Sequence, residues 1–216
     1  RQLVTRGSDK DFAFAKLAPQ HKHEVAAELL RRFEALKEPK LQHKVGEVIS
    51  KLADAACEKD DQRGWLAPGQ RGWPQLLSSA FRLADTSANA NTALCESSIR
   101  LLKDIVPTYK DEIVQAQQQL GSVVQNALAH GDAKIRCAAF VLVCELVGVL
   151  EKKAWAPLMA TADVLTQVLQ QLCQANLQDE LQECLQNYLE IASVEPDFFK
   201  QQLTAGMEPA KLLATL

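Results

Sequence analysis

The sequence predicts an all-α protein, an α-solenoid of HEAT repeats with about four complete helical hairpins and a partial repeat at each end. Two observations lead to this prediction. The composition favours helix, because 47% of the 216 residues are hydrophobic, only 6% are aromatic and nine are glycine. In addition, one helical pattern recurs at intervals close to the roughly 40–47 residues of HEAT and armadillo units.

The recurring pattern is an acid that follows a helical run and precedes a small or branched apolar residue. It occurs in VISKLADAA at 48–56, SIRLLKDIV at 98–106, FVLVCELVG at 140–148 and CLQNYLEIA at 184–192. The four acids are Asp54, Asp104, Glu145 and Glu190, with separations of 50, 41 and 45 residues. Because the position recurs, it indicates one surface acid per repeat rather than a catalytic residue.

Each recurring helix is preceded by another amphipathic helix and a short polar turn, which makes each repeat a helical hairpin. First helices are expected at 19–36, 73–85, 112–129 and 157–175, and second helices at 41–57, 92–106, 133–150 and 178–194. We predict one solenoid over 1–216, with repeats at 19–57, 73–106, 112–150 and 157–194 and partial repeats at 1–18 and 198–216. Wide apolar stripes, as in 135–146, require neighbouring hairpins on more than one side.

Local signals mark several helix ends. Pro19, Pro74 and Pro157 fall in first turns, where a missing N–H is harmless. Asp132 is the expected N-cap of the third second helix. With Arg136 four residues on, it is expected to lock successive turns into a ladder. The segment EKDDQRGWLAPGQR at 58–71 lengthens the first interval and is expected to be a loop.

The net charge of −3 and the pI near 5.9 provide no general attraction to nucleic acid or anionic membranes, so neither is an expected partner. No apolar run reaches the roughly 18 residues of a membrane span. The chain also lacks an initiator methionine and a signal sequence, so we expect a fragment of a longer protein.

The sequence contains no enzyme signature, so no catalytic residue, cofactor or metal site is predicted. HExxH, GxSxG, GxGxxG and GxxxxGK[ST] are all missing from it. The six cysteines are scattered and form no CxxC, which favours free buried thiols over disulfides or a zinc site.

The order of several motifs resembles the importin-beta (karyopherin-beta) family of nuclear transport receptors, in its N-terminal HEAT repeats. The motifs are EVAAELLRRFEAL, KVGEVISKLADAA, a charged loop followed by GWPQLL, and CESSIRLLKDIVP. Gly72-Trp73-Pro74 after the loop is the most specific element. The later stretch LQNYLEIASVEPDFFKQQL is similar to the importin beta-3 (karyopherin-beta-3) subgroup.

The resemblance implies a receptor that shuttles between cytoplasm and nucleus and carries protein cargo through the nuclear pore. Its implied partners are the GTP form of the GTPase Ran, nucleoporins with phenylalanine-glycine repeats, and protein cargo. Second helices would contact Ran or cargo, and first helices would receive nucleoporin phenylalanines. The implied contact residues are Glu47, Lys51, Asp54, Arg100, Asp104 and Glu145. Leu120, Val124, Leu165 and Leu169 are candidate nucleoporin slots, although core positions are the favoured interpretation of these four.

Two other functions remain open from the residues alone. A HEAT-repeat scaffold outside nuclear transport, such as a phosphatase or condensin-type regulatory subunit, would share the period and the hairpins. A helical-bundle enzyme would need convergent catalytic side chains in a pocket.

Overall fold

Every regular element in the described part of the chain is a helix, so the all-α solenoid prediction is confirmed. The structure, a computed structural model, describes residues 14, 17–57 and 72–199. The expected loop at 58–71, nearly all of the partial repeat at 1–18 and most of that at 198–216 lie outside these ranges.

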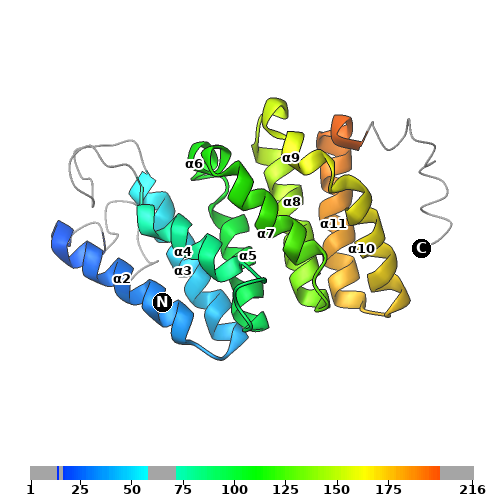
Figure 1. The fold of residues 1–216 in the computed structure, drawn as a ribbon. Coiled ribbons are helices and arrows are strands. Elements are labelled where there is room, and N and C mark those ends of the chain that lie inside the picture. The colour runs from blue at the N-terminus through cyan, green and yellow to red at the C-terminus, as the bar shows by residue number, and fades with distance from the viewer. Residues whose placement is uncertain (1–13, 15–16, 58–71, 200–216) are drawn as a thin grey trace.

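The helices form two layers of stacked hairpins (Figure 1). The layer of first helices contains α2 (Pro19–Ala35), α4 (Pro74–Ala84), α6 (Lys110–Gln115), α7 (Gln117–Leu128), α9 (Ala156–Met159) and α10 (Ala162–Gln174). The layer of second helices contains α3 (Pro39–Cys57), α5 (Thr92–Ile105), α8 (Ala133–Val149) and α11 (Gln178–Val194). Short 3-10 helices η3 (Lys152–Ala154) and η4 (Pro196–Phe199) follow α8 and α11. Each second helix packs against the next one along the chain.

Side chains and prolines define several of the helix starts. Helices α2 and α4 begin at their prolines, and Pro157 lies in the first turn of α9. The Asn91 Oδ1 atom accepts the Leu94 N–H at 3.2 Å at the start of α5. These contacts satisfy or remove N–H groups that have no partner within the helix.

Two of the expected first helices are interrupted, which corrects the continuous helices predicted at 112–129 and 157–175. Ala116 leaves helical geometry between α6 and α7, where its N–H is shared between the carbonyls of Glu112 and Ile113. The second break, between α9 and α10, has the Thr161 hydroxyl donating to the Leu158 carbonyl at 2.6 Å. Neither break contains a glycine or a proline, and each lies close to a buried residue, Ile113 or Leu158.

Helix α8 is the most deeply enclosed element, because α5, α7, α10 and α11 all pack around it. Eleven of its 17 residues are buried, from Ile135 to Val147. This explains the nearly unbroken apolar run of its sequence. Charged residues of α8 such as Glu145 are confined to the one side of the helix that α5, α11 and the first helices do not cover.

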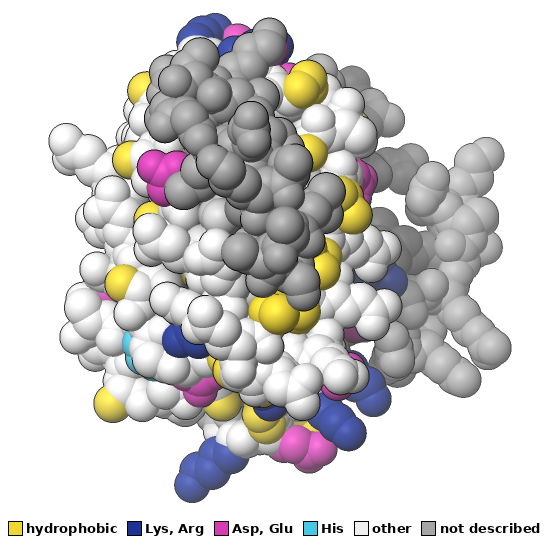
Figure 2. Space-filling view, turned by 90° about the vertical axis from the view of Figure 1, so that its right-hand side faces the viewer, with side chains coloured by type: hydrophobic (Ala, Val, Ile, Leu, Met, Phe, Trp, Pro, Cys, Tyr) yellow, Lys and Arg dark blue, Asp and Glu magenta, His cyan; other side chains and the backbone are white. Residues whose placement is uncertain are grey.

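The last second helix is less covered than α8. Leu189 and Val194 of α11 are 64% and 62% exposed, and Figure 2 shows hydrophobic side chains at the surface of this end of the molecule. Among the described residues, only α8, α10 and η4 pack extensively against α11. Among the described residues, α11 therefore leaves apolar positions exposed, whereas the inner helix α8 buries nearly all of its own.

A tight corner precedes α4 at the Gly72-Trp73-Pro74 motif. Gly72 has a φ of +75°, in the left-handed region that favours glycine. The Trp73 N–H donates to the Tyr109 hydroxyl oxygen at 2.7 Å, and both side chains are buried. A β-carbon at Gly72 would lie 3.0 Å from the Cys57 sulfur and 3.2 Å from the Tyr109 ring. The corner therefore needs a glycine for both conformation and space.

We expect Gly72→Ala to lower the free energy of unfolding by about 1–3 kcal/mol, because the left-handed backbone and the crowded corner both oppose a β-carbon. Gly121→Ala is the matched control, since a β-carbon at Gly121 in α7 meets no atom within 4 Å. In a helix interior that change gains about 0.5–1 kcal/mol. Urea unfolding of both variants tests the pair, and equal effects would contradict this account of the corner.

Candidate protein-binding face

The second helices together form a face with a hollow of about 340 Å³. Residues from all four second helices line it, and most of the lining side chains are charged or polar. They are His43, Gly46 and Glu47 from α3, Ser97, Arg100, Leu101, Lys103 and Asp104 from α5, Ala138 and Val141 from α8, and Glu183 from α11. A partly open hollow with charged and polar side chains in its lining can contact side chains of a partner protein.

Three of the predicted contact residues lie on α3. Glu47, Lys51 and Asp54 are all exposed, and their spacing of four and three residues places them along one side of the helix. Glu47 also lines the hollow, and Asp54 accepts a hydrogen bond from the Thr108 hydroxyl that follows α5. This stripe is the most accessible part of the predicted set.

Arg100 differs from these residues because it is held within the protein. Its Nη1 and Nη2 atoms donate to the two carboxylate oxygens of Glu183 at 2.6 and 3.0 Å, and its Nε donates to Glu96. The hydrogen bonds that Arg100 donates to Glu183, and the one that it donates to Glu96, raise the pKa of Arg100 against the opposing effect of burial. The same pair lowers the pKa of Glu183.

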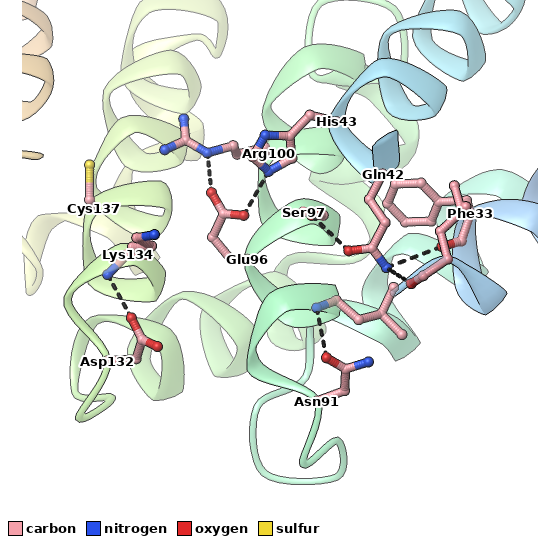
Figure 3. A network of polar contacts seen from close by, with 12 residues as sticks. Phe33, Gln42, His43, Asn91, Glu96, Ser97, Arg100, Asp132, Lys134 and Cys137 are labelled. Carbon is pink, nitrogen blue, oxygen red and sulfur yellow. Dashed lines mark hydrogen bonds and ion pairs between the residues drawn. The ribbon is translucent and has the colours of Figure 1, made fainter. Parts of the chain in front are cut away.

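Glu96 is the buried centre of this network (Figure 3). Its side chain is 8% exposed, and its Oε2 atom lies 2.7 Å from the His43 Nε2 of α3. Next to it, the Gln42 amide donates to the Leu36 carbonyl at 2.6 Å and accepts from the Ser97 hydroxyl at 3.4 Å. Buried polar groups that are satisfied in this way fix how α3 packs against α5.

On α11, Glu183 accepts a further hydrogen bond from the Cys137 thiol of α8 at 3.3 Å. Cys184 next to Cys137, together with burial, raises the pKa of the Cys137 thiol, so this sulfur remains protonated at neutral pH. The network thus joins α3, α5, α8 and α11 through His43, Glu96, Arg100, Glu183 and Cys137.

The sequence interpretation missed His43, Glu96 and Glu183. Glu96 and Arg100 are four residues apart on one helix, a spacing at which opposite charges pair, so that contact had a detectable signal. Glu183 is 83 residues from Arg100 in the sequence, and no local pattern connects them.

The recurring acids Asp104, Glu145 and Glu190 come together along the second helices. Burial is the largest influence on Glu145 and raises its pKa, Lys103 opposes this effect, and Asp104 and Glu190 add to it. Asp104 also accepts from the Lys103 ammonium at 3.1 Å, and its backbone carbonyl accepts from the Ser50 hydroxyl at 3.3 Å. The recurring position thus becomes a row of carboxylates with Lys103 beside it.

The expected repeat-ladder residues are occupied within their own turn. Asp132 caps α8 by accepting the Lys134 N–H at 2.8 Å (Figure 3). Arg136 donates from Nη1 to the carbonyls of His130 and Gly131 at 2.7 and 2.9 Å. These bonds join the turn to the helix that follows it, and a role in connecting successive turns stays a prediction.

The four candidate nucleoporin-slot residues are core residues, as the favoured interpretation expected. Leu120, Val124, Leu165 and Leu169 are between 1% and 3% exposed and belong to the hydrophobic core. An inserted phenylalanine ring would have to displace them, so any slot between first helices must use other side chains.

The described residues contain no group of three or more histidine, cysteine, aspartate or glutamate side chains suited to a metal ion. None of the helices that the structure describes combines the length and apolar character needed to cross a bilayer. Cys95, Cys137, Cys144 and Cys184 are buried cysteines outside any disulfide, and Cys57 and Cys173 are half-buried.

The candidate binding face lies within a part of the chain that matches a known protein family. The family described as "IPO5-like, TPR repeats" matches residues 37–208, which is most of the chain. The chain belongs to this IPO5-like family. The match covers helices α3 to α11 and therefore includes every second helix that lines the hollow. No curated protein matches the chain significantly.

Solved structures of the karyopherin Kap121p share the fold. Kap121p bound to Nup53p superposes with a TM-score of 0.67 at 16% identity, over 94% of this chain and 19% of Kap121p. Kap121p bound to Pho4p gives a TM-score of 0.67 at 16% identity, over 94% and 20%. A further Kap121p structure gives 0.63 at 17%, over 94% and 19%. The chain thus spans about a fifth of Kap121p, and the likeness establishes a karyopherin-type helical solenoid.

We expect Glu183→Gln to lower the free energy of unfolding at pH 7 by about 1–2 kcal/mol, less than for a fully buried pair, because Arg100 and Glu183 are about one-third exposed. Since Arg100 lowers the pKa of Glu183 in the folded state, this stabilisation is complete above the ordinary value of 4.5 and is lost as the pH falls further. Urea unfolding between pH 7 and pH 3 should show the two proteins converging in acid.

Glu145→Gln is the control with the opposite sign. Because burial raises the pKa of Glu145, its ionised form opposes folding at neutral pH. This variant should unfold at pH 7 with a free energy equal to or above that of the unmodified chain. A loss as large as that of Glu183→Gln would show that the two carboxylates do not differ in the way described.

Proposed function

We propose that this chain is part of an importin-beta nuclear transport receptor of the importin beta-3 (karyopherin-beta-3) subgroup. In this proposal it takes part in Ran-regulated import of protein cargo and shuttles between cytoplasm and nucleus. The family match over residues 37–208 carries the proposal, because it spans the stacked hairpins and the whole charged face. It also favours a transport receptor over a phosphatase or condensin-type scaffold.

The fold neighbours indicate the kind of partner. The karyopherin Kap121p has been crystallised bound to Nup53p and to the SUMO protease Ulp1p. We propose by analogy that this chain takes part in binding protein cargo and nucleoporins with phenylalanine-glycine repeats. A face of mixed charge with one partly open hollow is suited to a protein surface rather than to a small molecule.

We assign the Ran- or cargo-facing role to Glu47, Lys51, Asp54, Arg100, Asp104 and Glu145. The exposed stripe on α3 is available for direct contact. Arg100, Asp104 and Glu145 are half-buried. Arg100 and Asp104 also have ion-pair partners within the protein, so a binding protein would exchange contacts with these two. Charged contacts at an exposed face mainly increase the rate of association and make it sensitive to salt.

A solenoid suits regulated exchange of partners. Each hairpin contacts mainly its neighbours, so small rotations between repeats add up along the stack. Two partners that favour different curvatures then oppose each other's binding through one shared equilibrium. Ran and cargo would compete in this way as well as by direct overlap.

The first test of the proposed function measures binding of the chain to Ran loaded with GTP and with GDP. We expect preference for the GTP form, in this chain or in a version extended at its N-terminus. Isothermal calorimetry at two salt concentrations provides the affinities and their salt dependence. If both versions are helical and monomeric and neither binds, the Ran assignment is wrong for these repeats.

Charge reversal tests which face is used. Glu47→Lys combined with Asp54→Lys should weaken binding of the GTP form at least tenfold, which corresponds to about 1.4 kcal/mol or more. The control is Glu24→Lys on the exposed side of the first helix α2, which should leave the affinity unchanged. Equal losses from the α3 and α2 variants would argue against contact through the second helices.

A further inference from the structure

The Arg100–Glu183 ion pair connects two second helices that are not neighbours in the stack. Arg100 lies on α5 and Glu183 on α11, and α8 packs between them. In a solenoid most contacts join adjacent units. The geometry of an ion pair that extends over an intervening helix therefore depends on two packing interfaces, α5 with α8 and α8 with α11.

The intervening helix leaves room for this contact. Where α8 borders the hollow it presents Ala138 and Val141, and neither side chain carries a charge or extends far from the backbone. The long Arg100 side chain can therefore extend over α8 toward Glu183. A bulky residue at Ala138 would occupy the same space.

Both ends of the ion pair are fixed by other contacts. Arg100 Nε donates to the buried Glu96, which is itself paired with His43 at 2.7 Å. Glu183 accepts from the Cys137 thiol of α8 at 3.3 Å. These contacts hold Arg100 to α5 and Glu183 to α8 as well as α11, so neither side chain can move far toward the other. The pair therefore tolerates little change in the distance between α5 and α11.

Hydrogen bonds weaken steeply once donor and acceptor separate beyond about 3.5 Å. The two Arg100–Glu183 bonds measure 2.6 and 3.0 Å. Rotations at the α5–α8 and α8–α11 interfaces add together, so a small opening at each one exceeds this range. The pair can form only over a narrow range of curvature.

We propose that Arg100 and Glu183 form a latch that holds the curvature of this stack and opens when helices α5 and α11 move apart. The latch lies at the hollow, so a partner side chain that binds Arg100 or Glu183 would release it. This property concerns the chain by itself and holds whichever partner the face binds.

The Arg82–Glu34 pair provides a natural comparison. Arg82 of α4 donates to both oxygens of Glu34 of α2 at 3.2 and 3.0 Å, so it has the same bidentate form. It joins first helices of consecutive hairpins, and its side chains are 59% and 47% exposed. Because the Arg82–Glu34 pair crosses a single helix interface and is exposed to solvent, it should have little influence on the curvature of the stack.

Cys137 and Cys144 of α8 allow opening to be measured. Both thiols are buried, with residue exposures of 0% and 3%. Cys137 lies beneath the latch because it contacts Glu183, whereas Cys144 is two helical turns further along α8. Release of the latch should expose the first thiol and leave the second protected.

The experiment is pulse alkylation with iodoacetamide followed by peptide mass spectrometry, on the whole chain carrying Arg100→Gln or Arg82→Gln. Arg100→Gln retains Glu183, so the partner of Cys137 is still present. We expect Cys137 to be alkylated roughly tenfold faster in Arg100→Gln, with Cys144 unchanged and Arg82→Gln like the unmodified chain. Small-angle X-ray scattering should show a larger radius of gyration for Arg100→Gln only.

An unchanged alkylation rate of Cys137 in a folded Arg100→Gln variant would overturn the latch. Equal acceleration of alkylation at Cys137 and Cys144 would also overturn it, because that result indicates general unfolding. If the variant does not fold, the unmodified chain is measured from 0.05 to 1 M sodium chloride, because salt weakens a partly exposed ion pair. Selective acceleration of Cys137 supports the latch, and equal rates across this range overturn it. Since no Ran or cargo is used, this outcome is independent of the test of the proposed function.

Discussion

The structure depends on the burial of α8 by its neighbours on several sides. A helix with an apolar surface this wide cannot be covered by a single hairpin partner, so α5, α7, α10 and α11 must all pack around it. That requirement places α5 and α11 on opposite sides of α8. The charged face, the hollow and the ion pair that extends over α8 all follow from this arrangement.

Polar residues on the second-helix face follow two different rules. Where α3 borders solvent, Glu47, Lys51 and Asp54 are exposed and contribute little to stability. Closer to α8, Glu96, Arg100 and Glu183 lose water and must satisfy one another, which makes their geometry specific. One face therefore combines an accessible stripe for a partner with an inner network that fixes helix positions.

Much of the fold could be predicted from local patterns. The recurring acid, the spacing of apolar residues and the polar turns identify the hairpins, and the solenoid class was correct. The breaks at Ala116 and before α10 could not be predicted, because neither contains a glycine or a proline to mark it. In the proposed binding face, the exposure of residues such as Glu47 could be predicted from helix periodicity, because which side of a helix a residue occupies depends on its near neighbours in the sequence.

The sequence by itself determined the all-α class, the stretches that form most of the described helices and the position of one acid in each second helix, because these depend on residues within a few turns of one another. Only the tertiary structure decided which charges meet. Arg100 lines the hollow, and it is also paired with Glu183, which lies 83 residues away in the sequence. The small rotations between successive hairpins determine such a contact, and they are set by the packing of whole helices rather than by any local pattern.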